Sequence, residues 1–182
     1  MKEHIIISFR ITIALLVITC GVYPLLVWAV GQLAFHHRAN GSLITRSGRI
    51  IGSELIGQNF SSERYFHGRP SAVDYDATHS GGSNLGATSK KLEERIATAA
   101  RTFSSWPIPA DAVTTSASGL DPHISPANAL LQVSRVARAR GLEERRVRAL
   151  VEAHTEGRFL GVFGEPRVNV LLLNLALERG VS

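Results

Sequence analysis

The sequence predicts an α+β protein, with one N-terminal transmembrane helix followed by a single mixed α/β soluble domain. Residues 11–30 form an uncharged apolar run, and the rest of the 182-residue chain mixes short β-branched segments with helical periodicity. Hydrophobic residues make up 45% and charged residues 19% of the chain, which excludes a wholly disordered protein and a coiled coil. Its single cysteine, Cys20, excludes a disulfide scaffold and a zinc site built on cysteines.

Residues 11–35 are expected to cross a membrane, between a flank of residues 1–10 and a soluble domain of residues 36–182. A helix of 20 apolar residues is about 30 Å long, which matches the hydrocarbon core of a bilayer. The run is too long for the apolar region of a cleaved signal peptide or for a buried core helix, and it continues well past a lipoprotein signal that would end at Cys20. We expect Pro24 to kink or weaken this helix.

The charge pattern leaves the orientation of the span open and gives no sign of nucleic-acid binding. Two basic residues precede the span and three follow it closely, which is nearly balanced under the positive-inside rule. Residues 39–182 carry 17 Lys and Arg against 14 Asp and Glu, a net charge of +3. The arginines of residues 135–148 are interleaved with two glutamates, so we interpret them mainly as a solvated helical face, with an anionic partner as the alternative.

The first part of the soluble domain is expected to contain a hairpin, a long ordered loop and a helix. Residues 42–45 and 49–53 are β-branched segments around an Arg-Ser-Gly turn. Residues 57–87 are rich in glycine and proline, with aromatics that can pin the loop to a core. Apolar residues recur at helical spacing from about Ser89 to Trp106, and prolines follow.

The second part is expected to be mainly helical. Residues 110–124 begin strand-like and end in turn residues. Ser125 and Pro126 form a helix start, and that helix runs to Arg140 with Gly141 as its terminator. A further helix covers about 143–154. Residues 168–177 are apolar enough for a strand, a buried helix, or one followed by the other.

No common catalytic motif is present, but two segments have unusual chemistry. The chain lacks a nucleophile elbow, a P-loop, a dinucleotide-binding glycine motif and a zinc-protease motif, and its histidines have no metal-site spacing. A glycine loop at residues 80–84 can present successive backbone N–H groups to an anion. A polar run at residues 114–126 combines hydroxyls, a turn and a helix cap, so its donors must be satisfied internally or by a partner.

At these residues the chain resembles the KdpC family, the C subunit of the bacterial potassium-transporting P-type ATPase. The matching stretches are collinear and cover nearly the whole chain, and the single N-terminal membrane helix also agrees. They are residues 41–44 (GSLI), 52–58 (GSELIGQ), 65–72 (YFHGRPSA), 80–86 (SGGSNLG), 114–126 (TTSASGLDPHISP), 168–171 (VNVL) and 174–177 (NLAL). The polar run is the most specific of them.

The resemblance implies a non-catalytic accessory subunit of a high-affinity, ATP-driven potassium uptake complex in the bacterial inner membrane. Its partners would be a channel-like K⁺-binding subunit and a P-type pump subunit. It would stabilise their assembly and act as a catalytic chaperone that raises the ATP affinity of the pump. No permanently bound cofactor or metal is expected, and K⁺ is the transported ion. The family's proposed nucleotide contact maps to Ser80, Gly81, Gly82, Ser83 and Asn84.

We interpret the polar run as a structural and docking element, made up of Ser118, Gly119, Asp121, Pro122, His123 and Ser125. Two other classes stay open. A membrane-tethered periplasmic hydrolase could draw its chemistry from Ser118, Asp121 and His123, and a solute-binding module is the third possibility.

The nucleotide contact implied for the glycine loop conflicts with the side of the membrane that the resemblance also implies for the soluble domain. The loop touches ATP only if the soluble domain is cytoplasmic, whereas the resemblance also implies a domain outside the membrane, over the channel subunit. The loop lacks the lysine of a phosphate cradle, so we expect a periplasmic domain that acts through conformational coupling.

Overall fold

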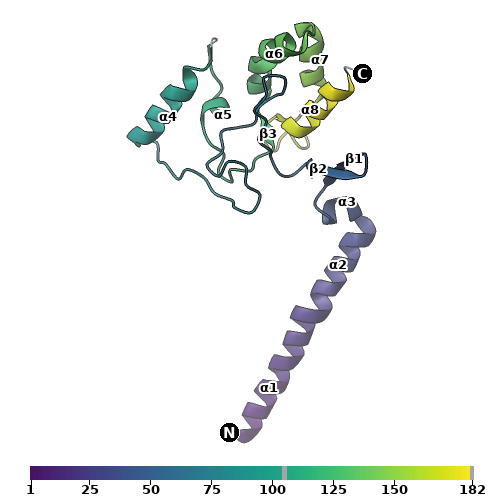
Figure 1. Cartoon of the computed structure of the whole chain (residues 1–182). Helices are drawn as coiled ribbons and strands as arrows, with labels where there is room; N and C mark the ends of the chain where they lie inside the picture. The colour runs from purple at the N-terminus through teal and green to yellow at the C-terminus, as the bar shows by residue number, and fades with distance from the viewer. Residues whose placement is uncertain (104–105, 181–182) are drawn as a thin grey trace. The chain divides into compact units, whose positions relative to one another are not determined.

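A computed structural model describes residues 1–103 and 106–180 (Figure 1). The chain divides into two compact units, Met1–Leu43 and Ile44–Ser182. The first holds a long apolar helix, and the second holds helices packed with small antiparallel sheets. This arrangement confirms the α+β class expected from the sequence.

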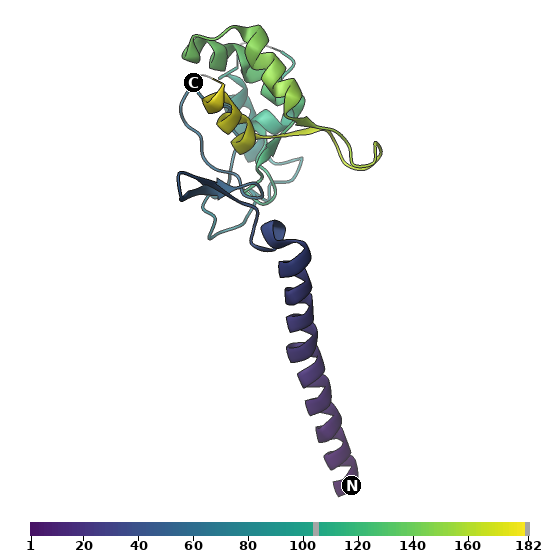
Figure 2. The same cartoon turned by 90° about the vertical axis from the view of Figure 1, so that its right-hand side faces the viewer.

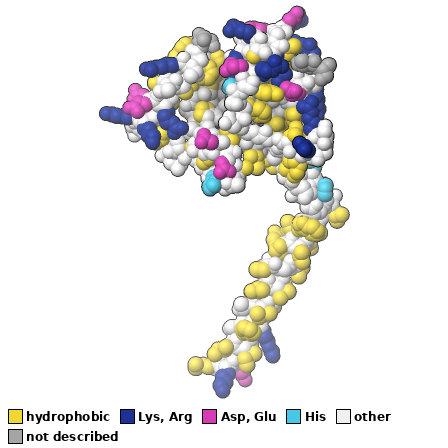
Figure 3. Space-filling view, viewed as in Figure 1, with side chains coloured by type: hydrophobic (Ala, Val, Ile, Leu, Met, Phe, Trp, Pro, Cys, Tyr) yellow, Lys and Arg dark blue, Asp and Glu magenta, His cyan; other side chains and the backbone are white. Residues whose placement is uncertain are grey.

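The first unit is dominated by an unbroken helical stretch of 33 residues, Lys2–Ala34. It consists of α1 (Lys2–Leu16), the π-helical segment η1 (Val17–Val22) and α2 (Tyr23–Ala34), and the short α3 (His36–Ala39) follows. Among the described residues it is the one helix long and apolar enough to cross a membrane, and no residue of its most apolar window is buried. Apolar side chains cover it, and its charges gather near the N-terminus (Figure 3).

Two details of this helix go beyond what the sequence specified. It begins at Lys2, within the residues expected to form a flank, so it is longer than residues 11–35. The irregularity expected at Pro24 takes the form of the π-helical turn of η1 just before it. Proline has no N–H to donate and crowds the carbonyl one turn earlier, and a wider turn accommodates both effects.

The second unit contains the predicted hairpin and a second small sheet. β1 (Leu43–Arg46) pairs with β2 (Arg49–Ser53), and positive φ angles at Ser47 (51°) and Gly48 (75°) form the turn between them. In the second sheet β5 (Arg167–Asn169) lies between β3 (His123–Ile124) and β4 (Thr155–Glu156), and both pairings are antiparallel.

Three helices form most of the core. They are α6 (Pro126–Arg140), α7 (Glu144–Ala153) and α8 (Val170–Arg179). Two of them, α6 and α8, contact β5, and α7 packs against both of these helices. The predicted start and end of α6 are confirmed: the Ser125 hydroxyl accepts a hydrogen bond from the Asn128 N–H, and Gly141 is left-handed with φ 67°. The apolar segment 168–177 is a strand followed by a helix, since β5 leads directly into α8. The core consists of Phe66, Ile124, Ala129, Val133, Val136, Ala137, Val147, Val151, Val168, Val170, Leu173 and Leu177.

The expectations for residues 89–124 need two corrections. The helix expected to reach Trp106 is α4 (Lys90–Ala100); Trp106 itself is 79% exposed, and residues 104–105 lie outside the described part. The residue before Pro107 is disfavoured in helical geometry, which opposes continuation to that point. Residues 110–113, expected to be strand-like, form the short helix α5 (Ala110–Val113), because Pro109 and Asp111 suit a helix start.

Candidate functional site

The glycine loop and the polar run lie against each other, although residues 85–113 separate them in sequence. The Ser118 carbonyl accepts hydrogen bonds from the Gly81 N–H (2.9 Å) and from the Ser80 hydroxyl (3.2 Å). The Thr115 hydroxyl donates to the Ser83 hydroxyl at 3.1 Å. Three of the five loop residues therefore use polar groups to hold the polar run.

The other two loop residues are Gly82 and Asn84. A Cβ added to Gly82 would lie 2.9 Å from the Ala117 carbonyl oxygen, so this glycine permits close backbone packing. Asn84 is exposed and left-handed, with φ 53°. The loop is thus shaped by its contact with residues 115–118.

In this contact, position 119 is the one where a side chain is least tolerated. The φ of Gly119 is +70°, and an added Cβ would lie 2.5 Å from a Val73 methyl carbon and 2.7 Å from the Gly81 carbonyl oxygen. The Gly119 carbonyl accepts a hydrogen bond from the Ser71 hydroxyl at 2.7 Å. A side chain at position 119 would separate residues 71–73, the glycine loop and the polar run from one another.

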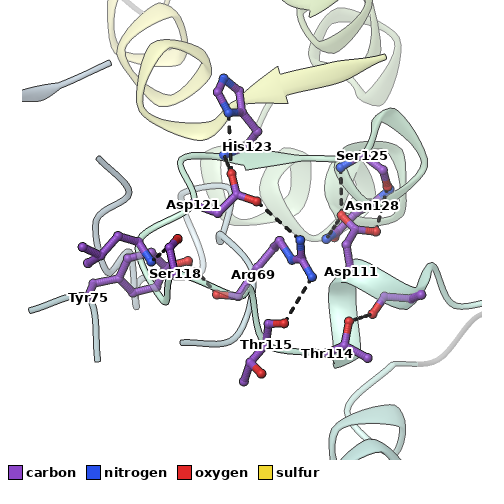
Figure 4. Close-up of polar contacts among 12 residues, drawn as sticks. Arg69, Tyr75, Asp111, Thr114, Thr115, Ser118, Asp121, His123, Ser125 and Asn128 are labelled. Carbon is purple, nitrogen blue, oxygen red and sulfur yellow. Dashed lines mark hydrogen bonds and ion pairs between the residues drawn. The ribbon is translucent and has the colours of Figure 1, made fainter. Parts of the chain in front are cut away.

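Arg69 connects the polar run to Tyr75 (Figure 4). Its guanidinium donates to the Thr115 carbonyl (Nη2, 3.2 Å) and pairs with Asp121 (Nη1 to Oδ2, 3.4 Å), while its own carbonyl accepts from the Tyr75 hydroxyl at 2.6 Å. Its Nε is buried and has no hydrogen-bond partner among the described residues. Sequence reasoning gave Arg69 no role of its own and expected Tyr75 only to pin the loop to a core, since only the fold brings the two residues to the polar run.

Asp121 is the electrostatic centre of this cluster. It accepts a hydrogen bond from the His123 N–H at 2.9 Å, and the His123 ring nitrogen Nδ1 lies 3.6 Å from the same carboxylate oxygen. Partial burial opposes ionisation of Asp121, but the hydrogen bonds of His123 and the charge of Arg69 outweigh it and hold the carboxyl pKa below its usual range. Burial, and then the negative charge of Asp121, raise the pKa of Tyr75 to about 12.

Pro122 and the helix cap Ser125 anchor this cluster to neighbouring elements. Pro122 is buried, and its carbonyl accepts from the N–H of Val170 at 2.9 Å. The Ser125 N–H and hydroxyl both donate to the carboxylate of Asp111, at 2.8 and 2.9 Å. Sequence reasoning missed Asp111. Asp111 lies in the first turn of the short helix α5. Two signals in the sequence could have predicted this helix: Pro109 just before it and an acidic residue in its first turn.

The geometry gives no support to a hydrolase built on Ser118, Asp121 and His123. A serine nucleophile needs a base within hydrogen-bond reach. The Ser118 hydroxyl instead accepts from the Leu120 N–H at 3.1 Å, and Figure 4 shows the His123 ring on the far side of Asp121 from Ser118. Within residues 1–103 and 106–180, no group of three or more His, Cys, Asp and Glu side chains could hold a metal ion.

A cleft of about 1100 Å³ lies beside the cluster, between the loop residues and the helices α4 and α6. Arg69 and Tyr75 line it together with His67 and Arg135. Burial lowers the pKa of His67, whose backbone is clamped by the Gln132 side chain through bonds of 2.8 and 3.1 Å. The cleft was not foreseen, because it is formed by segments distant in the sequence.

Comparison with known proteins identifies the family. The family model for KdpC, described as the K⁺-transporting ATPase c chain, matches residues 5–179. The chain belongs to the KdpC family. It is 50% identical to the potassium-transporting ATPase KdpC subunit of Koribacter versatilis, over 98% of this chain and 95% of the relative. It is 52% identical to that of Sorangium cellulosum, over 98% of each chain, and 55% identical to that of Gloeobacter violaceus, over 88% of each.

These findings confirm the resemblance drawn from the sequence and make the chain a subunit of a K⁺-transporting ATPase. The polar cluster at Arg69, Asp121 and Gly119 lies in two of the stretches that carried the resemblance, residues 65–72 and 114–126. The structure brings those two stretches together in one contact.

Proposed function

We propose that the chain is a non-catalytic accessory subunit that stabilises a potassium-transporting ATPase complex and raises the ATP affinity of its pump subunit. The family match over residues 5–179 carries this proposal. Its proposed partners are a channel-like K⁺-binding subunit and a P-type pump subunit. The family description, the c chain of a K⁺-transporting ATPase, supports the presence of other subunits. ATP hydrolysis then belongs to the pump.

The effect on ATP affinity operates through conformational coupling, without contact between ATP and the glycine loop. The Gly81 N–H and the Ser80 hydroxyl both donate to the Ser118 carbonyl of the polar run, which leaves fewer donors for phosphate oxygens. A phosphate cradle also uses a lysine, and residues 80–84 contain none. A subunit that prefers one conformation of the pump changes the affinity of a remote site.

The proposed location is the bacterial inner membrane, with one span at the N-terminal helix and the soluble domain in the periplasm. The continuous apolar helix Lys2–Ala34 supports the span. Orientation is testable with one cysteine at Ala87, an exposed residue just after the glycine loop, in a Cys20→Ser chain. Labelling by an impermeant maleimide in intact spheroplasts is expected, whereas labelling only after permeabilisation would overturn the periplasmic assignment.

The accessory role is tested by comparing the complex with and without this chain. A tag on this chain should recover two larger multi-span proteins from detergent-solubilised membranes, together with K⁺-stimulated ATPase activity. Complexes prepared without the chain should need a higher ATP concentration for half-maximal activity, or should fall apart. An unchanged ATP dependence in an intact complex would refute the chaperone role, and ATP turnover by this chain alone would refute the non-catalytic assignment.

A further inference from the structure

A protruding hairpin, residues 157–166, carries an apolar surface that the core does not use. The hairpin extends from the paired strands β4 and β5 and projects from the helices of its unit (Figure 2). Its tip is closed by two backbone hydrogen bonds between Phe159 and Phe163, of 2.8 and 2.9 Å. Leu160 (φ 53°) and Gly161 (φ 74°) make the turn left-handed. These bonds give the hairpin a defined shape, and we call it the apolar finger.

The tip of the finger exposes four bulky apolar side chains in five consecutive residues. Phe159 is 72% exposed, Leu160 76%, Val162 71% and Phe163 63%. Single exposed apolar residues are ordinary, but a contiguous group at a projecting tip is typical of an interaction site. Aromatic side chains are also the residues that most often dominate binding when they enter a pocket.

The charges at the base of the finger favour a protein partner over a lipid surface. Arg158 pairs with Glu165 (2.8 Å) and Arg167 pairs with Glu156 (2.9 Å), so residues 156–167 have no net charge. Segments that bind bilayer surfaces combine apolar residues with excess Lys or Arg, or with interfacial Trp and Tyr. Residues 156–167 contain no Lys, Trp or Tyr, and both of their cations are already paired.

We propose that the apolar finger inserts into an apolar recess on the soluble face of another subunit of the same ATPase complex, and that Phe159, Leu160, Val162 and Phe163 are its contact residues. The inference rests on the accessory function proposed above, because it needs a complex that holds the chain. The paired arginines would then lie at the rim, where polar groups stay in contact with water. Insertion covers the apolar tip that the isolated chain leaves in solvent.

The test replaces two tip residues and measures assembly. Phe159→Ser with Leu160→Ser removes apolar surface, and Phe159→Leu with Leu160→Met is the matched control that keeps it. Both pairs leave the backbone bonds of the hairpin possible, and the tip contributes nothing to the core, so the thermal midpoint of the full chain in detergent should not change. We expect the serine pair to recover about tenfold less of the two larger subunits, and the control pair to behave as the unaltered chain.

A cross-linking experiment identifies what the tip touches. In a Cys20→Ser chain, Leu160→Cys is labelled with a benzophenone maleimide, and the purified complex is irradiated in lipid vesicles. An adduct with the mass of this chain plus one larger subunit supports the proposal. Adducts with lipid alone, or with a second copy of this chain, overturn it.

The two proposals fail in different ways. If the serine pair assembles fully and keeps K⁺-stimulated ATPase activity, the finger is not a docking element and the accessory function stands. If the unaltered chain recovers no larger subunit, the accessory function itself is refuted.

Discussion

Two regions of the second unit are held together by different forces. In the helical region, α6, α7 and α8 bury a continuous set of valine, leucine and alanine side chains against β5. In the loop-built region, residues 57–87 and 114–125, the contacts are mostly hydrogen bonds to backbone carbonyls and close approaches at glycines. Phe66 connects the two, because its side chain is buried in the core while its backbone exchanges two hydrogen bonds with the Asn174 side chain.

The difference predicts how each region tolerates change. Burial of apolar surface is not directional, so an aliphatic core accepts substitutions that keep its volume. A hydrogen bond or a glycine contact depends on one atom at one position, and a buried donor or acceptor that loses its partner costs the whole desolvation penalty. The loop-built region should therefore be the less tolerant of conservative replacements.

The largest expected effect lies in the helical region. Leu173 has no exposed surface, and Leu173→Ala should lower the free energy of unfolding by about 2–5 kcal/mol, through lost burial and the cavity that remains. Leu172, half-buried one residue earlier on α8, is the matched control, and Leu172→Ala should cost clearly less. Chemical denaturation of the full chain in detergent measures both. Equal losses of unfolding free energy in the two variants would contradict the burial of Leu173 in the core.

The next effect tests the loop-built region. Gly119→Ala places a methyl group against Val73 and the Gly81 carbonyl in a left-handed residue, and should cost about 2–4 kcal/mol from crowding and backbone strain together. Gly86→Ala is the control, since Gly86 has no positive φ and nothing within 4 Å of an added Cβ. A Gly119→Ala protein with unaltered stability would show that the glycine loop and the polar run are not packed together.

The sequence was a better guide to features that depend on neighbouring residues than to the contacts of the loop-built region. The cap at Ser125, the terminator at Gly141 and the hairpin turn at residues 47–48 depend on neighbouring residues, so a local pattern specifies them. The bonds from Arg69 to Thr115 and Asp121 join segments more than 45 residues apart. No spacing in the sequence encodes such a contact, and family resemblance pointed to those stretches without saying that they touch.

Replacing Asp121 should have a smaller effect on the free energy of unfolding, and this effect should depend on pH. Asp121→Asn should cost about 1–3 kcal/mol at neutral pH, because the carboxylate is held by His123 and Arg69. The carboxyl pKa of Asp121 is lower in the folded state than its unfolded value of about 3.9. The ionised carboxylate therefore stabilises the fold above about pH 3.9, and this stabilisation is lost as the pH falls through the folded-state pKa.

The stability difference between wild type and Asp121→Asn should therefore be present at about pH 5 to 7 and shrink below about pH 4. Glu152→Gln, on the exposed side of α7, controls for the loss of one negative charge. Unfolding free energies measured across this pH range decide the matter, and a difference that grows in acid would contradict the assignment.

The smallest effect concerns Ser125, which belongs to both regions because it is the last residue of the loop-built region and the N-cap of α6. Ser125→Ala removes the hydroxyl that accepts from the Asn128 N–H and donates to Asp111, and should cost about 1 kcal/mol, the usual value of a lost cap. Ser134→Ala, on the exposed surface of the same helix, should be neutral or slightly stabilising, since alanine favours a helix interior. If the polar run is structural, the ATPase activity of the Ser125→Ala complex should fall only as far as assembly falls. Full assembly and a normal melting temperature without activity would instead place chemistry at this run, because a cap that only supports the fold cannot abolish turnover in a complex that has formed.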